Sequence, residues 1–156
     1  MKRFAFKFIY FLFPLVILMF IADYYISKKI KTGHSIYLKG NLGTGKTTFS
    51  KYLIKEIFKK NNKKSPEVTS PTFNIAQYYP IKAQKIIAHY DLYRLKKPKD
   101  LDHIGLHELE DKVISIVEWP EIIKKKNKNR IEIALKHTKL DNQRNVSIKY
   151  FGSIKK

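Results

Sequence analysis

Apolar and polar positions in this chain follow two periods, one typical of strands and the other typical of helices. Short β-favouring runs predict strands over residues 35–38, 73–79 and 85–93, and a buried strand within residues 113–121 that Pro120 ends. Between the first two, apolar residues at helical spacing predict a helix over residues 48–58. The apolar face of this helix contains Phe49, Leu53, Ile57 and Phe58. These elements are those of an α/β protein.

Weaker patterns predict further elements on both sides of this region. Ala22, Ile26 and Ile30 share one helical face, and we expect Gly33 to end that helix as a C-cap glycine. A second short amphipathic helix is predicted from the spacing of Leu101, Ile104, Gly105 and Leu109. Near the C-terminus, residues 130–135 and 145–151 predict a β-hairpin around a polar turn.

A complete phosphate-binding motif lies between the first predicted strand and its helix. Gly40, Gly45, Lys46 and Thr47 match G-x-x-x-x-G-K-[ST], with Gly43, Thr44 and Thr48 beside them. Backbone N–H groups at a helix N-terminus meet phosphate oxygens only where no Cβ intervenes, and Gly43 and Gly45 provide that clearance. Lys46 would reach the β- and γ-phosphates, and the Thr47 hydroxyl would ligate Mg²⁺. An ordinary glycine turn is the alternative.

Two acids stand at the ends of predicted strands. In "VISIVEWPE", Glu118 ends an apolar run beside a P-loop, where a carboxylate holds Mg²⁺ or orients an attacking water. Period-two alternation places His89, Asp91 and Tyr93 on one face of their strand. Ligands of open α/β sheets gather beyond the carboxyl ends of strands, so Asp91 is a candidate for holding Mg²⁺ or its water. A solvated edge strand explains Asp91 equally well, and a chance acid at a strand end is the alternative for Glu118.

The loop over residues 66–72 contains two prolines and three hydroxyl side chains. In a P-loop protein, a hydroxyl-bearing loop after the first helix is where a γ-phosphate sensor lies, and Thr72 is our candidate. A plain proline turn is the alternative.

His103 and His107 have the spacing of zinc ligands, but the accompanying acid pattern and a third ligand are missing, so no zinc site is predicted.

Composition narrows the function classes. A chain of 156 residues is one domain by size, and the absence of cysteine excludes disulfides, thiolate zinc sites and cysteine nucleophiles. The formal charge of +19 attracts nucleic acid or an anionic surface, but only four of the 32 basic residues are arginine. We therefore favour solvated surface charge, with attraction to tRNA or an acidic partner as the alternative.

Residues 8–22 form an uncharged, almost wholly apolar run after a basic start. The run is short for a spanning helix, although counting from Phe4 and letting Lys7 snorkel extends it to transmembrane length. One interpretation makes residues 1–21 an N-terminal anchor, with weak membrane contact through residues 4–22. The other makes them a non-native start, through a misplaced start or an altered reading frame. In both, a P-loop domain covers residues 22–156.

Five motifs occur in a specific order: "GNLGTGKTTF", "TSPTF", "HYDLYRL", "IGLHELE" and "VEWPE". Together they resemble the bacterial family of tRNA threonylcarbamoyladenosine biosynthesis ATPases, TsaE, formerly YjeE, over roughly residues 24–152. The resemblance implies a P-loop NTPase-like three-layer fold, with a mixed central sheet and flanking helices. It also implies weak, partner-dependent hydrolysis of ATP with Mg²⁺. The implied location is the cytoplasm, or the cytoplasmic face of the inner membrane if the anchor is real.

The implied partners are threonylcarbamoyl-transferase subunits of the TsaD and TsaB type, and tRNA indirectly through their complex. The implied product is modified adenosine 37 in tRNAs that read codons beginning with A.

Two other functions stay open at this point. A small-molecule P-loop kinase needs paired arginines, which the scattered Arg94, Arg130 and Arg144 do not suggest. A catalytically silent membrane-anchored adaptor is the other.

The resemblance also assigns roles to residues. It places Gly43, Thr44, Gly45, Lys46, Thr47 and Thr48 at the phosphates. Thr47 and Glu118 are assigned to Mg²⁺, and Asp91 is assigned to metal positioning or catalysis. Lys46 is assigned to catalysis together with Asp91 and Glu118. Thr72 lies in a switch-like loop, Trp119 lies beside the site, and Arg144 contacts the nucleotide. Gln143 stands where the family has a glycine, and residues 1–21 share nothing with the polar segment that the family has there.

Overall fold

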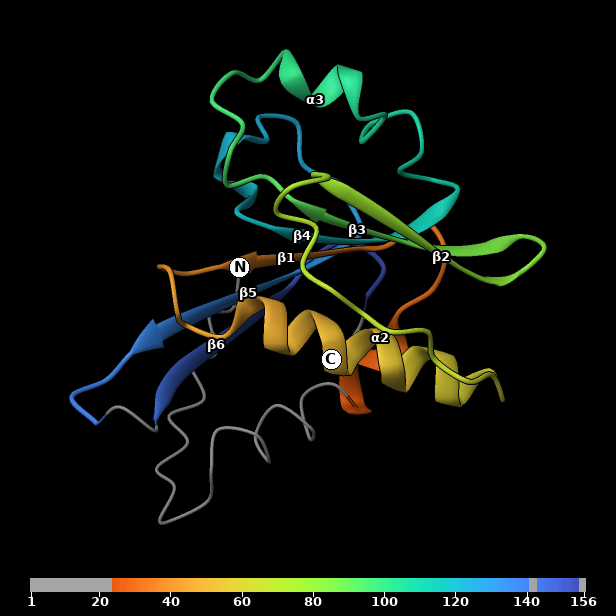
Figure 1. Ribbon diagram of the computed structural model, residues 1–156, viewed down its shortest axis with the longest axis horizontal. Coiled ribbons are helices and arrows are strands. Elements are labelled where there is room, and N and C mark those ends of the chain that lie inside the picture. Colours follow the sequence, from red (N-terminus) through yellow and green to blue (C-terminus); the bar gives the residue numbers. More distant parts are fainter. Residues whose placement is uncertain (1–23, 141–142, 155–156) are drawn as a thin grey trace.

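The computed structural model describes residues 24–140 and 143–154, which form a mixed six-stranded sheet between two helical layers (Figure 1). The strand order is β2-β3-β4-β1-β5-β6. The strands are β1 (Ser35–Lys39), β2 (Ala76–Lys82), β3 (Lys85–Asp91), β4 (Val113–Glu118), β5 (Arg130–His137) and β6 (Arg144–Tyr150). The four inner strands are parallel and both edge strands are antiparallel to their neighbours. This arrangement confirms the predicted α/β class and mixed sheet.

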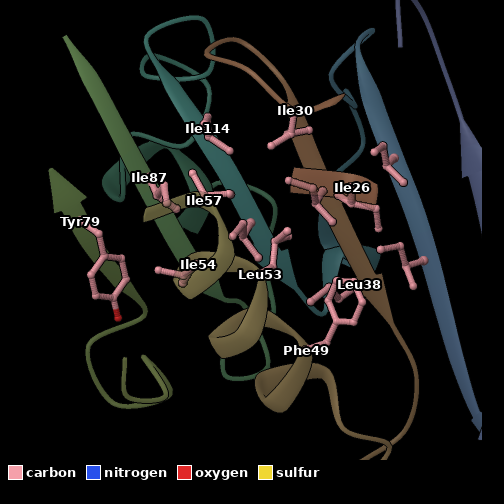
Figure 2. Packing of buried hydrophobic residues seen from close by; sticks show 14 of the residues in the cluster. Ile26, Ile30, Leu38, Phe49, Leu53, Ile54, Ile57, Tyr79, Ile87 and Ile114 are labelled. Atoms are coloured by element: carbon pink, nitrogen blue, oxygen red, sulfur yellow. The ribbon is translucent and has the colours of Figure 1, made fainter. Parts of the chain in front are cut away.

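One face of the sheet is covered by the long helix α2 (Lys46–Lys60) and by a short helix over residues 24–29. Figure 2 shows Phe49, Leu53 and Ile57 of α2 pointing into the core beneath the sheet. These three side chains are at most 1% exposed, as their helical spacing predicted. Burying each contributes on the order of 2 kcal/mol. This packing holds the first turn of α2 against the carboxyl end of β1.

The opposite face is covered by the segment between β3 and β4, which contains the short helix α3 (Asp100–His103), and by the 3-10 turn η1 (Pro120–Ile122). Leu101 and Leu106 pack there against Tyr37 and Tyr90 of the sheet. The amphipathic helix predicted as far as Leu109 is wrong in extent, since α3 has four residues. Gly105 has a φ of 64° and takes the chain into turns.

Other predicted elements also differ from the structure in their bounds, and the strand predicted over residues 85–93 ends at Asp91. The helix near the N-terminus ends at residue 29, so Gly33 is not its cap; its N–H donates instead to the carbonyl of Val113. The strand predicted from Phe73 begins at Ala76, because residues 72–75 form a turn in which Ile75 has a φ of 65°. The predicted C-terminal hairpin is confirmed as β5 and β6.

The residues of the anchor hypothesis, 1–21, lie outside the described residues. Within the described ranges, none of the helices has the length and apolarity required to span a bilayer.

Candidate nucleotide-binding site

Three neighbouring parallel strands end at the same edge of the sheet. Glu118, the last residue of β4, is in register with Asp91 at the end of β3 and with Leu38 near the end of β1. The glycine-rich loop leaves β1 at this edge and leads into α2. Because carboxyl ends of parallel strands form the crevice of open α/β sheets, the topology brings both acids to the loop.

A pocket of about 340 Å³ opens at this edge. Its lining residues are Leu42, Gly43, Gly45, Lys46, Thr47, Thr48, Thr72, Asp91, Tyr93, Glu118 and Trp119. Of the predicted site residues, only Thr44 and Arg144 are not in this lining. Thr44 is 1% exposed and its hydroxyl donates to the carbonyl of Asn41, so it braces the loop from within. Arg144 donates through Nη2 to the carbonyl of Gly43 at 3.3 Å, which places it over the loop.

The loop requires glycine for two separate reasons. Gly40, Gly43 and Gly45 all have positive φ, of 145°, 73° and 98°. A Cβ on Gly40 would lie 2.3 Å from the carbonyl oxygen of Leu135, whereas a Cβ on Gly43 would meet nothing closer than 3.9 Å. Gly40 is therefore required by packing, while Gly43 leaves open space over the start of α2 where an anion can approach the backbone.

Lys46 lies under the loop and faces the pocket. Its Nζ donates to the carbonyls of Gly40 at 2.7 Å and Asn41 at 2.9 Å, and lies 3.8 Å from the centre of the Trp119 ring. Burial lowers the pKa of Lys46, and the negative charge of Glu118 partly opposes this effect. A desolvated ammonium facing an open pocket is a strong site for phosphate oxygens.

Glu118 is 1% exposed and is held by three side chains. Its Oε2 accepts from the Thr47 hydroxyl at 2.8 Å, and its Oε1 accepts from the Ser50 hydroxyl at 3.1 Å. His89 Nε2 lies 2.9 Å from the same Oε1. Sequence reasoning assigned no role to His89 or Ser50. The available signals were the position of His89 on the Asp91 face of its strand, and that of Ser50 one helical turn after Lys46.

Asp91 also has both carboxylate oxygens engaged. Oδ2 accepts from the Thr72 hydroxyl at 2.6 Å, and Oδ1 accepts from the backbone N–H of Tyr93 at 3.1 Å. Because β3 is an inner strand and Asp91 is 4% exposed, the alternative of a solvated edge strand is wrong. The Thr72 loop is thereby tied to the pocket through the side chain of Asp91.

The donor atoms around the pocket suit Mg²⁺. Thr47, Glu118 and Asp91 offer hydroxyl and carboxylate oxygens, which are the ligands that this hard cation prefers. Within the described parts of the chain, no three His, Asp or Glu side chains cluster closely enough to hold a metal by themselves. This sparse set fits Mg²⁺, which is usually bound by one or two carboxylates together with water and substrate phosphates.

The sheet, the glycine-rich loop and the pocket beside it define an α/β protein with a P-loop NTPase-like fold. The crystal structure of YdiB from Bacillus subtilis has this fold with a TM-score of 0.67 and 22% identity, covering 97% of this chain and 87% of that one. The family model described as threonylcarbamoyl adenosine biosynthesis protein TsaE matches residues 21–146, so the chain belongs to the TsaE family. This confirms the resemblance found from the five motifs.

Curated relatives agree with this family. Proteins named tRNA threonylcarbamoyladenosine biosynthesis protein TsaE are similar to this chain in several bacteria. That of Rickettsia felis is 37% identical over 99 residues, covering 64% of this chain and 55% of the relative. That of Rickettsia prowazekii is 38% identical over 99 residues, covering 63% and 65%. That of Aquifex aeolicus is 40% identical over 96 residues, covering 62% and 65%. The chain thus spans about half to two thirds of the length of these relatives.

Proposed function

We propose that this chain is an ATPase that serves threonylcarbamoyladenosine modification of tRNA. The proposed product is modified adenosine 37 in tRNAs that read codons beginning with A. The proposed partners are threonylcarbamoyl-transferase subunits of the TsaD and TsaB type, with tRNA reached through their complex. Family membership and the names of the relatives support the pathway. The observation that carries the ATPase part is the hydrogen bond of 2.8 Å between Thr47 of the P-loop and Glu118 of β4.

The predicted site residues that line the pocket each have a proposed task. The backbone of residues 43–48 and the ammonium of Lys46 bind the phosphates. Thr47 and Glu118 hold Mg²⁺, with Asp91 beside them, and the metal when bound neutralises charge on the transferring phosphoryl group. Glu118 also orients the attacking water, since its carboxylate is already fixed and shielded from bulk solvent. Thr72 acts as the γ-phosphate sensor, and its hydrogen bond to Asp91 links it to the site.

Hydrolysis is favoured over transfer to a small molecule. A kinase of small metabolites needs paired arginines facing the pocket to grip a second anionic group. Among the described arginines, Arg94 lies over the Phe73 ring at 5.7 Å and Arg130 pairs with Glu132. Arg144 reaches the loop from the side of β6 without lining the pocket. Water is therefore the proposed acceptor.

Reconstitution tests this function. The full chain is combined with the transferase subunits, tRNA, threonine, bicarbonate and γ-labelled ATP, and both free phosphate and the modified nucleoside are measured. We expect modified nucleoside only when the chain is present, with label released as free phosphate. Equal modification without the chain would overturn the role in the pathway, and label on a metabolite would indicate a kinase. Nucleotide binding without hydrolysis under these conditions would indicate a silent adaptor.

A further inference from the structure

We propose that His89 positions the Glu118 carboxylate for the metal-bound nucleotide, with Ser50 as a secondary donor. This inference rests on the proposed ATP-binding function. Glu118 uses its two oxygens differently: Oε1 faces His89 and Ser50, and Oε2 faces Thr47, which lines the pocket. A carboxylate anchored through one oxygen presents the other in a defined direction. His89 thus makes Oε2 the oxygen that faces the metal site.

His89 is the better placed of the two donors to Glu118 Oε1, the other being Ser50. Ser50 has one hydroxyl proton, and its Oγ lies 3.1 Å from both Glu118 Oε1 and the carbonyl oxygen of Lys46, so its donation is divided. His89 Nε2 lies 2.9 Å from Oε1, and its ring is 0% exposed. Its other ring nitrogen, Nδ1, has no hydrogen-bond partner among the described residues. The network therefore assigns the ring proton to Nε2, where it is donated to Glu118.

Burial makes this donor difficult to replace. Glu118 is 1% exposed, so water does not readily take the place of a lost protein donor. A terminal carboxylate torsion is broad and roughly two-fold, so a Glu118 that has lost the hydrogen bond from His89 is held only by Thr47 and Ser50 and samples a wider range of orientations. Side chains that orient a metal ligand through hydrogen bonds typically change metal affinity about 10- to 100-fold when they are removed.

Three substitutions at His89 separate the donated hydrogen bond from packing. The amide nitrogen of Gln occupies a position similar to that of Nε2, whereas the shorter Asn places its amide near the position of Nδ1. His89→Gln is therefore the rescuing variant, His89→Asn is a polar control that does not reach, and His89→Leu removes the donor. Ser50→Ala tests the secondary donor.

The readout is metal affinity, measured apart from turnover. Mn²⁺ binding is followed by electron paramagnetic resonance in the full chain with a non-hydrolysable ATP analogue, and analogue binding is measured separately without metal. We expect Mn²⁺ to bind about 10-fold or more weakly in His89→Leu and His89→Asn, within about 3-fold of wild type in His89→Gln, and with a smaller loss in Ser50→Ala. Analogue binding without metal should be unchanged in all four.

Different failures have different meanings. Wild-type Mn²⁺ affinity in both His89→Leu and His89→Asn would overturn the positioning role while leaving the proposed ATPase intact. Equal losses in His89→Gln and His89→Asn, with analogue binding weakened as well, would assign His89 to packing and overturn the inference. Absence of analogue binding by the wild-type chain would overturn the proposed function and this inference with it. If His89→Leu does not fold, the Gln and Asn pair still decides, because both carry the same amide.

Discussion

The ammonium of Lys46 lies 3.8 Å from the centre of the Trp119 ring. This contact exists because Trp119 follows Glu118 in a left-handed conformation, with φ 58° and ψ 55°, which turns the chain sharply at the end of β4. The turn places the ring beside the glycine-rich loop, where it lines the pocket. A residue with a side chain in this conformation is strained, and such strain often accompanies a functional site.

Trp119 should report nucleotide binding, since it is the single tryptophan of the chain. We expect its fluorescence to change on titration with ATP, as Lys46 exchanges the ring and the loop carbonyls for phosphates. Lys46→Ala should weaken binding about 10-fold or more, as expected for the loss of charged hydrogen bonds. Lys51→Ala, on the same helix, is the control and should bind as wild type. Unchanged affinity in Lys46→Ala would remove this lysine from the site.

Glu118→Gln should separate hydrolysis from binding. The substitution keeps the shape of the side chain but removes the charge that faces Thr47, so phosphate release should fall about 100-fold, as for a positioned general base. Nucleotide should still bind, as measured by Trp119 fluorescence. Glu108→Gln is the control, because Glu108 is exposed and does not line the pocket. Turnover at the wild-type rate in Glu118→Gln would make Glu118 no more than a strand terminus.

Asp91→Asn should behave like Glu118→Gln if Asp91 faces the metal. We expect turnover to fall by a similar factor with nucleotide still bound.

Thr72→Val removes the 2.6 Å hydrogen bond to Asp91 and should cost about 1 to 3 kcal/mol of stability, measured by urea unfolding. Thr72→Ser keeps the hydroxyl and should restore wild-type stability. Reduced stability in Asp91→Asn with intact hydrolysis would assign Asp91 to holding the Thr72 loop alone.

Gly40→Ala should mainly lower stability, whereas Gly43→Ala should mainly weaken nucleotide binding. The new Cβ at Gly40 would lie 2.3 Å from the Leu135 carbonyl oxygen, so β1 and β5 must separate locally, with a loss of about 4 kcal/mol or more. At Gly43 the space is open, and the left-handed backbone alone should cost about 1 to 2 kcal/mol. Gly43→Ala should instead weaken nucleotide binding. Similar unfolding free energies for the two variants would contradict this assignment.

Glu132 should make stability depend on acid pH. Burial alone would raise its pKa, but hydrogen bonds from Lys39 and Arg130, together with nearby lysine charges, outweigh burial and lower the pKa from 4.5 to about 2. Because the folded pKa is depressed, the stabilisation is complete above about pH 4.5 and is lost as the pH falls toward 2.

Glu132→Gln should therefore lower the free energy of unfolding at pH 7 by on the order of 2 to 3 kcal/mol, and the difference from wild type should shrink between pH 4.5 and 2. Denaturant unfolding at several pH values checks this. Glu67→Gln, at an exposed position, is the control and should change little. A difference that does not vary with pH would mean that the ion pairs of Glu132 do not stabilise the fold.

The sequence by itself determined the elements that depend on neighbouring residues. The run from β1 through the glycine-rich loop into α2 is continuous in the chain, so strand, motif and helical period are visible together. The apolar run that ends in Glu118 and the hairpin of β5 and β6 are also local patterns. By contrast, the turn at residues 72–75 and the early end of α3 involve positive φ at Ile75 and Gly105, which a hydrophobic period does not reveal.

Only the tertiary structure decided how the acids are held. Glu118 meets Thr47, Ser50 and His89 across 71, 68 and 29 residues of chain. These contacts exist because β4 lies between β3 and β1 in the sheet, with Glu118 in register with Asp91 and Leu38. Strand order and register arise from packing of the whole core, since a shift of one residue would turn every side chain of a strand to the opposite face. His89, which alternation places on the same face as Asp91, therefore meets Glu118 only because β3 is paired with β4.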